Sequence, residues 1–280
     1  MHAKRWVWHR PSIIPGFGIS LGLTLFTLGL VVLLPLSLLF LQASHVDTAT
    51  FWQIATEERA LSAYGLSFGG ALIAALVNLL FGTLIAWVLV RYRFPGKHFL
   101  DAAIDLPFAL PTAVAGIALT TLWAANGWLG HGLLPWGYKV AYTRVGVVIA
   151  MIFVGLPFVV RTVQPVLATM ENELEEAAIS LGASRVQTFL LVIVPTLLPA
   201  LATGFALAFS RAVGEYGSVV FIAGNLPNLT EIAPLLIMIK LEQYDTFGAS
   251  VIACVMLLLS FTILFSLNTL QRLFQRRLER

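Results

Sequence analysis

The chain has 280 residues, of which 59% are apolar and only 11% are charged, and its mean hydropathy is +0.89. Soluble domains contain roughly 45–50% apolar and about 25% charged residues, so this composition excludes a soluble enzyme and a disordered chain. We therefore expect an all-α polytopic membrane protein. The single cysteine, Cys254, excludes an internal disulfide and a cysteine metal cluster. The five histidines share no metal-site spacing, so we expect no metal and no cofactor in this chain.

Apolar runs predict six transmembrane helices, because each crossing needs about 20 apolar residues. The expected spans are about 18–41, 66–90, 104–124, 145–165, 194–222 and 247–269. They divide the chain into a cytoplasmic N-terminus (1–17), a transmembrane domain (18–270) and a cytoplasmic tail (271–280), with one long inner loop at 166–190.

Glycines and prolines in these spans indicate how the helices pack against one another. Gly18-x-x-x-Gly22 and Gly65-x-x-x-Gly69 permit close helix contact, although glycine is also simply common in membrane helices. Pro107 and Pro111 remove backbone donors in the third span. Such breaks are tolerated where neighbouring protein or a cavity satisfies the freed carbonyls, so they suggest helices packed around a pathway.

The basic residues predict the orientation in the membrane. With the N-terminus inside, 12 of the 17 Lys and Arg fall in inner segments, four in outer segments, and Arg211 within a span. This bias favours six spans with both termini cytoplasmic. A seventh span at 226–241 would move four C-terminal arginines outside and would have to absorb Glu231 and Lys240, so we expect a short outer helix there instead. Arg161, near the inner end of the fourth span, is expected to reach the headgroups.

The inner loop at 166–190 predicts two short helices separated by a glycine turn. Asn172-Glu-Leu-Glu175 and Ser184-Arg-Val-Gln187 resemble capping boxes, and Gly182 is placed to end the first helix. Glu173, Glu175 and Glu176 would complement the helix dipole. An apolar stripe with i, i+3, i+4 and i+7 spacing comprises Leu174, Ala177, Ala178 and Leu181. The stripe fits either packing against the chain's own inner helix ends or docking on a soluble partner.

A longer motif in this loop resembles the EAA signature of ABC-importer permeases, E-A-A-x3-G-x9-I-x-L-P. Here it reads Glu176-Ala177-Ala178-x3-Gly182, nine residues, then Val192-Ile193-Val194-Pro195, with valines at the Ile and Leu positions. The resemblance implies that this helix, with Leu174 and Leu181, is a coupling helix that inserts into a cleft of a separate ABC ATPase, present in two copies. ATP and Mg²⁺ would be bound by that ATPase.

A nucleotide site of the chain's own is not expected. A phosphate-binding P-loop needs G-x-x-x-x-G-K-[ST]. The nearest candidate, Gly96-Lys97, is followed by His98 and lacks the first glycine, because Arg91 stands there. We therefore expect a transport subunit and not an enzyme.

Arg211 and Glu215 are the only charges expected inside the fifth span. They are four residues apart, which predicts one helix face, and Arg211 would lie roughly 24 Å from the entry at Pro195. Intramembrane ionisable residues usually face a bundle interior or a cavity. The pair fits two readings. It could anchor the helix, or Arg211 could offer donors to a passing oxyanion while Glu215 limits the affinity. Gly214 and Gly217 would let another backbone come close.

Several further segments resemble the sulfate and molybdate branch of these permeases. They are Arg211-Ala-Val-Gly-Glu-Tyr-Gly217 with Val219–Pro227, and Asp105-Leu-Pro-Phe-Ala-Leu-Pro-Thr-Ala-Val-Ala-Gly116. Thr230-Glu-Ile-Ala-Pro234 and Lys240-Leu-Glu-Gln-Tyr-Asp245 resemble T-type sulfate/thiosulfate permeases in particular. The likeness runs from about residue 15 to 270.

This resemblance implies a type I ABC importer permease fold and half of the pore of an ATP-driven sulfate/thiosulfate importer. Arg211, Glu215, Tyr216 and Gly217 would lie at the translocation pathway or gate. The implied location is the bacterial inner membrane. The implied partners are the ATPase, a second W-type permease and a periplasmic sulfate/thiosulfate-binding protein; no nucleic acid is expected.

Other functions remain as alternatives. The nearest is a permease for another oxyanion, such as molybdate or tungstate. A secondary anion carrier usually shows broken helices paired in two halves, and no such internal symmetry is present. A membrane enzyme should gather nucleophiles, bases or metal ligands at one depth, whereas only Arg211 and Glu215 cluster. Neither rival explains the capped, apolar-striped helix of the inner loop.

Overall fold

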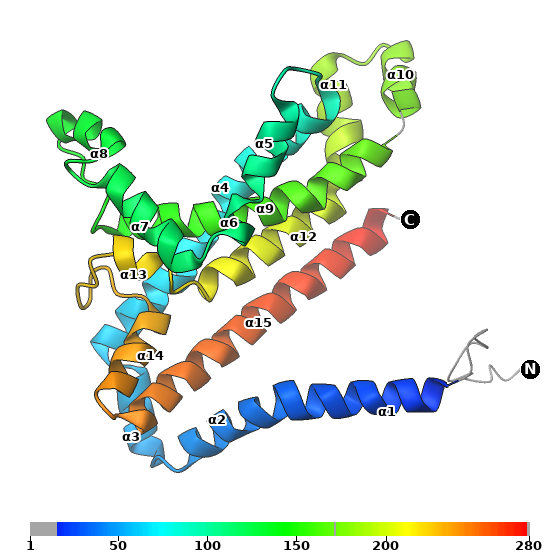
Figure 1. The fold of residues 1–280 in the computed structure, drawn as a ribbon. Coiled ribbons are helices and arrows are strands. Elements are labelled where there is room, and N and C mark those ends of the chain that lie inside the picture. Colours follow the sequence, from blue (N-terminus) through cyan, green and yellow to red (C-terminus); the bar gives the residue numbers. More distant parts are fainter. Residues whose placement is uncertain (1–15, 171, 279–280) are drawn as a thin grey trace, which may run out of the picture.

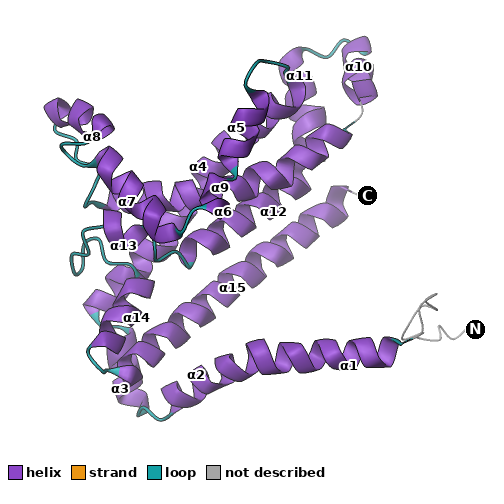
Figure 2. Cartoon of the chain, in the orientation of Figure 1, coloured by secondary structure: helices purple, strands orange, loops and turns teal. Residues whose placement is uncertain are grey.

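The computed structural model describes residues 16–170 and 172–278, with side chains except at 172 and from 270 onward, and these ranges contain helices and no strands (Figure 2). The predicted all-α fold is confirmed. In chain order the helices are α1 (Phe17–Leu28), α2 (Leu34–Ser44), α3 (Thr48–Ala55), α4 (Glu58–Arg91), α5 (Lys97–Ile104), α6 (Leu106–Ala109), α7 (Thr112–Trp123), α8 (Trp128–Leu133), α9 (Arg144–Thr169), α10 (Asn172–Ser180), α11 (Arg185–Thr188), α12 (Val194–Val213), α13 (Val219–Ile222), α14 (Ala233–Glu242) and α15 (Thr246–Leu278).

Within the described ranges, five helical stretches are long and apolar enough to cross a bilayer. They are Phe17–Ser44, Glu58–Arg91, Arg144–Thr169, Arg185–Val213 and Thr246–Thr269. The third predicted span, 104–124, is instead the broken pair α6 and α7. Leu110 is extended between them because it precedes Pro111, which also lacks a backbone donor. The sequence predicted this break, and a crossing by α6 and α7 stays a prediction.

The helix at the fifth predicted span, 194–222, has different ends from that range. The helical stretch begins earlier, at Arg185, and runs into α12 through a π-helical turn (Phe189–Ile193) just before Pro195. Alpha-helix α12 then ends at Val213. Two features explain this end: Gly214 and Gly217 have low helix propensity, and the Glu215 carboxylate accepts the Ser218 N–H, which competes with the helical bond.

The stretch 226–241 contains α14, whose ten residues are too few to cross a membrane. Just before it, the buried Glu231 carboxylate accepts two hydrogen bonds of 2.7 Å from Arg59 of α4. After it, the Asp245 carboxylate accepts a hydrogen bond from the Gly248 N–H at 2.8 Å and forms an ion pair with Lys240 at 3.0 Å. These two contacts hold the pKa of Asp245 below its ordinary value. The structure therefore agrees with a short helix at this position and not a seventh span.

The centre of the bundle is formed by α4, α9 and α12. The buried face of α4 consists mostly of small residues, among them Ala71, Ala74 and Ala75, while large residues such as Leu80 and Phe81 point outward. This is the pattern of a membrane helix, in which small residues let backbones approach and large ones face lipid or another subunit.

The two ends of the bundle differ in what they carry (Figure 1). Helices α10 and α11 and the start of α5 lie at one end, and α3, α8, α13 and α14 lie at the other. The start of α1 and the end of α15 both point to the side of α10. This arrangement agrees with two termini on the side of the inner loop; that this side is cytoplasmic stays a prediction.

Helix α1 stands apart from the rest of the described chain. None of its residues is buried, and a Cβ added at Gly18 or Gly22 would meet nothing within 4 Å. The same is true of Gly65 and Gly69 on α4. Both predicted glycine patterns therefore lie on open surface of this chain and make no close contact within it.

We predict that Gly82→Ala destabilises the bundle. A Cβ at Gly82 would lie 2.9 Å from the Val159 Cβ of α9, so the two helices would have to separate. Overpacking of this kind typically costs about 1–3 kcal/mol. The thermal unfolding midpoint in detergent should fall for Gly82→Ala. Gly69→Ala on the same helix has open space, so its midpoint should stay near that of the unsubstituted protein; equal midpoints for both variants would contradict the close packing.

Candidate functional site

The inner loop forms a helix whose apolar stripe faces outward. Leu174 and Ala177 of α10 are exposed, Ala178 is half-buried, and Leu181 just beyond the helix is 89% exposed. The stripe therefore does not pack against the chain's own inner helix ends, which was one of the two predicted alternatives. An exposed apolar stripe on a short helix leaves a surface suited to a partner.

The turns that frame α10 have the predicted geometry. Gly182 has φ = 84°, a left-handed conformation that favours glycine, and the Ala183 N–H donates to the Ala178 carbonyl at 3.0 Å. Ser184 and Gln187 form both bonds of a capping box and start α11. Both predictions are confirmed. The Asn172 side chain lies outside the described part of the chain, so its capping role stays a prediction.

An ion pair that the sequence analysis missed connects α10 to the bundle. Arg91, at the inner end of α4, pairs with Glu175 and also lies over the Trp87 ring, 5.4 Å from its centroid. Trp87 in turn contacts Phe189 edge-to-face, with ring centroids 5.9 Å apart. Thus α10 is joined to α4 and to the start of the next helical stretch. No sequence pattern marks the Arg91–Glu175 pair, because 84 residues separate its members.

The predicted pair in the fifth span exists, but it lies at a helix end. Arg211 is in the last turn of α12 and Glu215 follows the helix, with 2.5 Å between Nη1 and Oε2. The Glu215 side chain is only 2% exposed, and its Oε1 also accepts the Ser218 N–H at 2.8 Å and the Ser218 hydroxyl at 2.7 Å. The buried Glu215 carboxylate thus has three donors from two residues, Arg211 and Ser218.

The guanidinium of Arg211 is more accessible than its partner. Its side chain is 32% exposed, and among the described residues its only hydrogen-bonding or charged partner is Glu215. The exposed part of the Arg211 side chain is therefore accessible to an anion. The Arg211 guanidinium can therefore offer a fixed positive charge to an anion, because the oxygens of the neighbouring Glu215 carboxylate are already hydrogen-bonded.

The segment after Arg211 packs very closely on α7. A Cβ at Gly217 would lie 2.1 Å from the Thr112 hydroxyl oxygen, and one at Gly116 would lie 2.5 Å from the Ser218 carbonyl oxygen. Tyr216 is half-buried against the main core. Gly217 thus makes the predicted close approach, whereas Gly214 is exposed and meets only Ser210 O at 3.9 Å.

A second charged cluster was also missed by the sequence analysis. Arg161 of α9 donates two bonds of 2.6 and 2.8 Å to the Asp105 carboxylate, and it donates to the Asp101 carboxylate at 2.7 Å and to the Asp101 backbone carbonyl at 2.8 Å. Arg161 thus pairs with two carboxylates, one on α5 and one just after it, and that it reaches the headgroups stays a prediction. The bonds from Arg161 hold the pKa of Asp101 below its ordinary value. One feature of the sequence could have indicated this cluster. Arg161 lies near the end of the fourth predicted span, and Asp105 lies near the start of the third, proline-rich span.

The described residues include no group of three or more His, Cys, Asp and Glu that could hold a metal ion. The candidate site therefore consists of two parts: the exposed stripe of α10, and the Arg211–Gly217 segment at the opposite end of α12. The first can bind a protein, and the second can contact an anion.

Solved structures with a similar fold are membrane transporters. The bacterial alginate ABC transporter in complex with an alginate-pentasaccharide-bound periplasmic protein superimposes with a TM-score of 0.72 at 14% identity, covering 91% of this chain and 93% of that one. The MetNI methionine ABC transporter in inward-facing form gives a TM-score of 0.58 at 14% identity, with 82% and 99% covered. These likenesses show the ABC-importer permease fold.

The sequence decides the family. Residues 78–280 match the family described as binding-protein-dependent transport system inner membrane component. The chain belongs to this family. Its relatives include the sulfate transport system permease protein CysT of Escherichia coli, 49% identical over 265 residues, which are 95% of this chain and 96% of that protein. Another is the probable sulfate transport system permease protein of Nephroselmis olivacea, 56% identical over 250 residues, with 89% and 88% covered. This permease is a component of a transport system.

We predict that Arg211→Ala destabilises the permease and that adding Glu215→Gln restores most of the loss. Removing Arg211 leaves a buried carboxylate without its cation, which typically costs about 3–5 kcal/mol, whereas a neutral amide at residue 215 carries no such penalty. Thermal unfolding midpoints of both single variants and the double variant would measure this coupling. Additive losses would show that the ion pair does not stabilise the segment.

Proposed function

We propose that this permease forms half of the translocation pore of an ATP-driven importer of sulfate or thiosulfate. The observation that carries the proposal is identity of 49–56%, over about nine-tenths of the chain, to permeases described as components of sulfate transport systems. This degree of likeness disfavours molybdate or tungstate as the substrate. The proposed location is the bacterial inner membrane, with both termini in the cytoplasm.

We propose that energy comes from an ABC ATPase in two copies, which binds ATP and Mg²⁺, and that this chain has no ATPase site of its own. The exposed α10 stripe supports this, because Leu174 on this short helix and Leu181 just after it are large apolar side chains that face outward beside the Gly182 turn. An ATPase cleft could close around this helix, because small side chains let its walls come close to the helix backbone. The residues proposed to couple to the ATPase here are Glu176, Ala177, Ala178 and Gly182.

A second, W-type permease is the proposed partner within the membrane. Helix α1 supports this, because it is apolar but buries none of its residues against its own chain, and its glycine pattern is open. The large outward residues of α4 offer further surface. A periplasmic sulfate/thiosulfate-binding protein would deliver the substrate to the end that carries α8 and α14 (Figure 1).

The mechanism we propose is alternating access driven through α10. ATP binding closes the ATPase dimer and moves α10, and the Arg91–Glu175 pair and the Trp87–Phe189 contact pass that motion to α4 and α12. Because α4, α9 and α12 are closely packed, they would move together. Arg211 would contact the oxyanion in the pathway, and Glu215, Tyr216 and Gly217 would hold Arg211 against α7.

Substitution of Arg211 should lower sulfate uptake even where folding is preserved. In the Arg211→Ala/Glu215→Gln double variant, loss of a charge-assisted bond of about 1.5–3 kcal/mol corresponds to roughly ten- to hundredfold slower uptake. Radiolabelled sulfate uptake into proteoliposomes containing the complete transporter measures it. The Glu215→Gln single variant retains Arg211 and is the matched control. Uptake by the double variant equal to that of this control would leave Arg211 a purely structural role.

The docking role of α10 predicts that Leu181→Glu weakens ATPase association at least about tenfold, because a charge replaces an apolar side chain in a desolvated contact. Gly182→Val should also uncouple uptake, since φ = 84° strains a β-branched residue, whereas Gly182→Asn tolerates that conformation. Association is measured with purified ATPase on permease-containing nanodiscs.

Unchanged ATPase association in Leu181→Glu, together with unchanged uptake in Gly182→Val, would contradict the proposal that α10 docks on the ATPase.

A further inference from the structure

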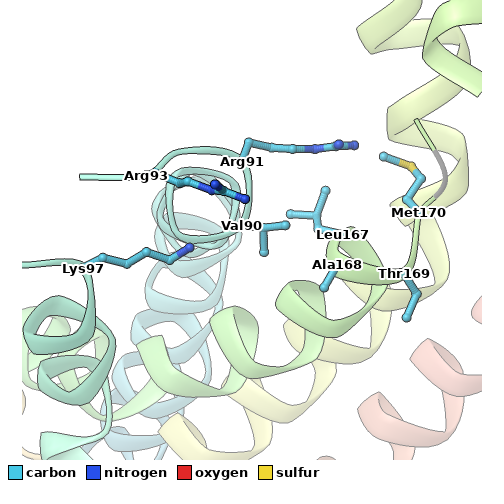
Figure 3. Close-up of a pocket in the computed structure, with 8 residues that line it drawn as sticks. All are labelled: Val90, Arg91, Arg93, Lys97, Leu167, Ala168, Thr169 and Met170. Carbon is cyan, nitrogen blue, oxygen red and sulfur yellow. The ribbon is translucent and has the colours of Figure 1, made fainter. Parts of the chain in front are cut away.

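A basic cavity of about 650 Å³ lies at the inner end of the bundle. Figure 3 shows its lining, which comes from the end of α4, the start of α5 and the end of α9. Arg91, Arg93 and Lys97 supply three cations, and no acidic residue lines the cavity. Neither the coupling helix nor the Arg211 segment contributes to this lining.

The three cations differ in how they are engaged. Arg91 pairs with Glu175, and the Lys97 ammonium donates a long bond of 3.4 Å to the Tyr92 carbonyl. Arg93 is exposed and, within the described part of the chain, forms no hydrogen bond or ion pair. Figure 3 shows the Arg93 and Lys97 side chains extending toward the same part of the cavity, near Val90.

The charge balance of the cavity favours an anion. Two helices, α4 and α9, end here, and each contributes about half a negative charge from its last carbonyls. Glu175 offsets one further positive charge through Arg91. Against three cations this leaves a positive excess of about one charge, and it is concentrated on Arg93 and Lys97, which have the weakest internal partners.

We propose that this cavity binds a tetrahedral oxyanion group, supplied either by the phosphate of an anionic lipid headgroup or by a free inorganic oxyanion. Its position suits both sources. Trp87 and Tyr92 flank it at the inner helix ends, where aromatic residues sit at headgroup level, and basic pockets between helices on that side bind lipid phosphates. The guanidinium of Arg93 matches a planar pair of oxyanion oxygens.

The cavity is connected to the coupling helix through Arg91, which lines it and also holds Glu175. An oxyanion in the cavity competes with Glu175 for that guanidinium, and occupancy therefore changes how firmly α10 is held. This regulatory link rests on the proposed function, whereas binding of the oxyanion does not.

Binding is tested on the intact transporter, purified with its partner subunits, without any uptake measurement. In one arm, the complex is reconstituted in phosphatidylcholine nanodiscs with and without phosphatidylglycerol, and native mass spectrometry counts retained phosphatidylglycerol. In the other arm, equilibrium dialysis in detergent measures binding of radiolabelled inorganic sulfate. Arg93→Gln removes a cavity cation, and Arg185→Gln removes an exposed arginine of the same end that does not line the cavity.

Arg93→Gln should lower affinity about fivefold relative to Arg185→Gln in at least one arm, the loss expected for one basic residue near a membrane surface. A loss confined to the nanodisc arm identifies the lipid, and one confined to the dialysis arm identifies the free ion. Lys97→Gln serves as a second cavity variant if Arg93→Gln does not assemble. Indistinguishable affinities of the cavity variants and Arg185→Gln in both arms would overturn the proposal, whether or not the complex transports sulfate.

Discussion

The cost of an unpaired charge in hydrocarbon is the constraint on which the rest of this structure depends. The bundle contains few charged residues, and three of its arginines, Arg59, Arg91 and Arg161, pair with carboxylates of distant segments. Arg59 joins α4 to Glu231 before α14, and Arg161 joins α9 to the α5–α6 segment. Each of these ion pairs gives both charges a partner and at the same time connects a short helix to one of the long ones.

The same constraint shapes both parts of the candidate site. Glu215 is fully buried because Arg211 and Ser218 satisfy its carboxylate, and satisfying it requires the chain to leave the helix after Val213. At the other end, Arg91 satisfies Glu175 and thereby attaches α10 to the bundle. The apolar stripe of α10 needs no such partner within the chain, and it is the surface left open for another subunit.

Much of this could be predicted from the sequence, because membrane-spanning segments and helix caps are local patterns. Composition gave the class, charge-free runs located the long helices, and Gly182 and Ser184 marked the turns around α10. What could not be predicted depends on tertiary contact. Arg161 meets Asp105 only because α5 and α6 fold back on α9, and Arg91 meets Glu175 across 84 residues. The end of α12 was missed because a helix-period reading of Arg211 and Glu215 ignores the competing bond to Ser218.

Helix exposure also supports the proposal that this chain works together with a second permease. Its three central helices are packed as closely as glycine and alanine allow, whereas α1 is apolar on all sides and contacts almost nothing. A helix of that kind is stable in lipid, and its exposed surface is available to another membrane subunit. The account therefore depends on subunits that complete the pore and drive it.

The most direct test is the composition of the particle that this chain forms. Affinity purification of the tagged chain from its own membranes, followed by native mass spectrometry and ATP-dependent sulfate uptake in proteoliposomes, measures both assembly and activity. The account predicts one copy of this chain with one second permease and two ATPase subunits, and uptake that stops without ATP. A chain that purifies alone and transports sulfate alone, without ATP, would contradict it.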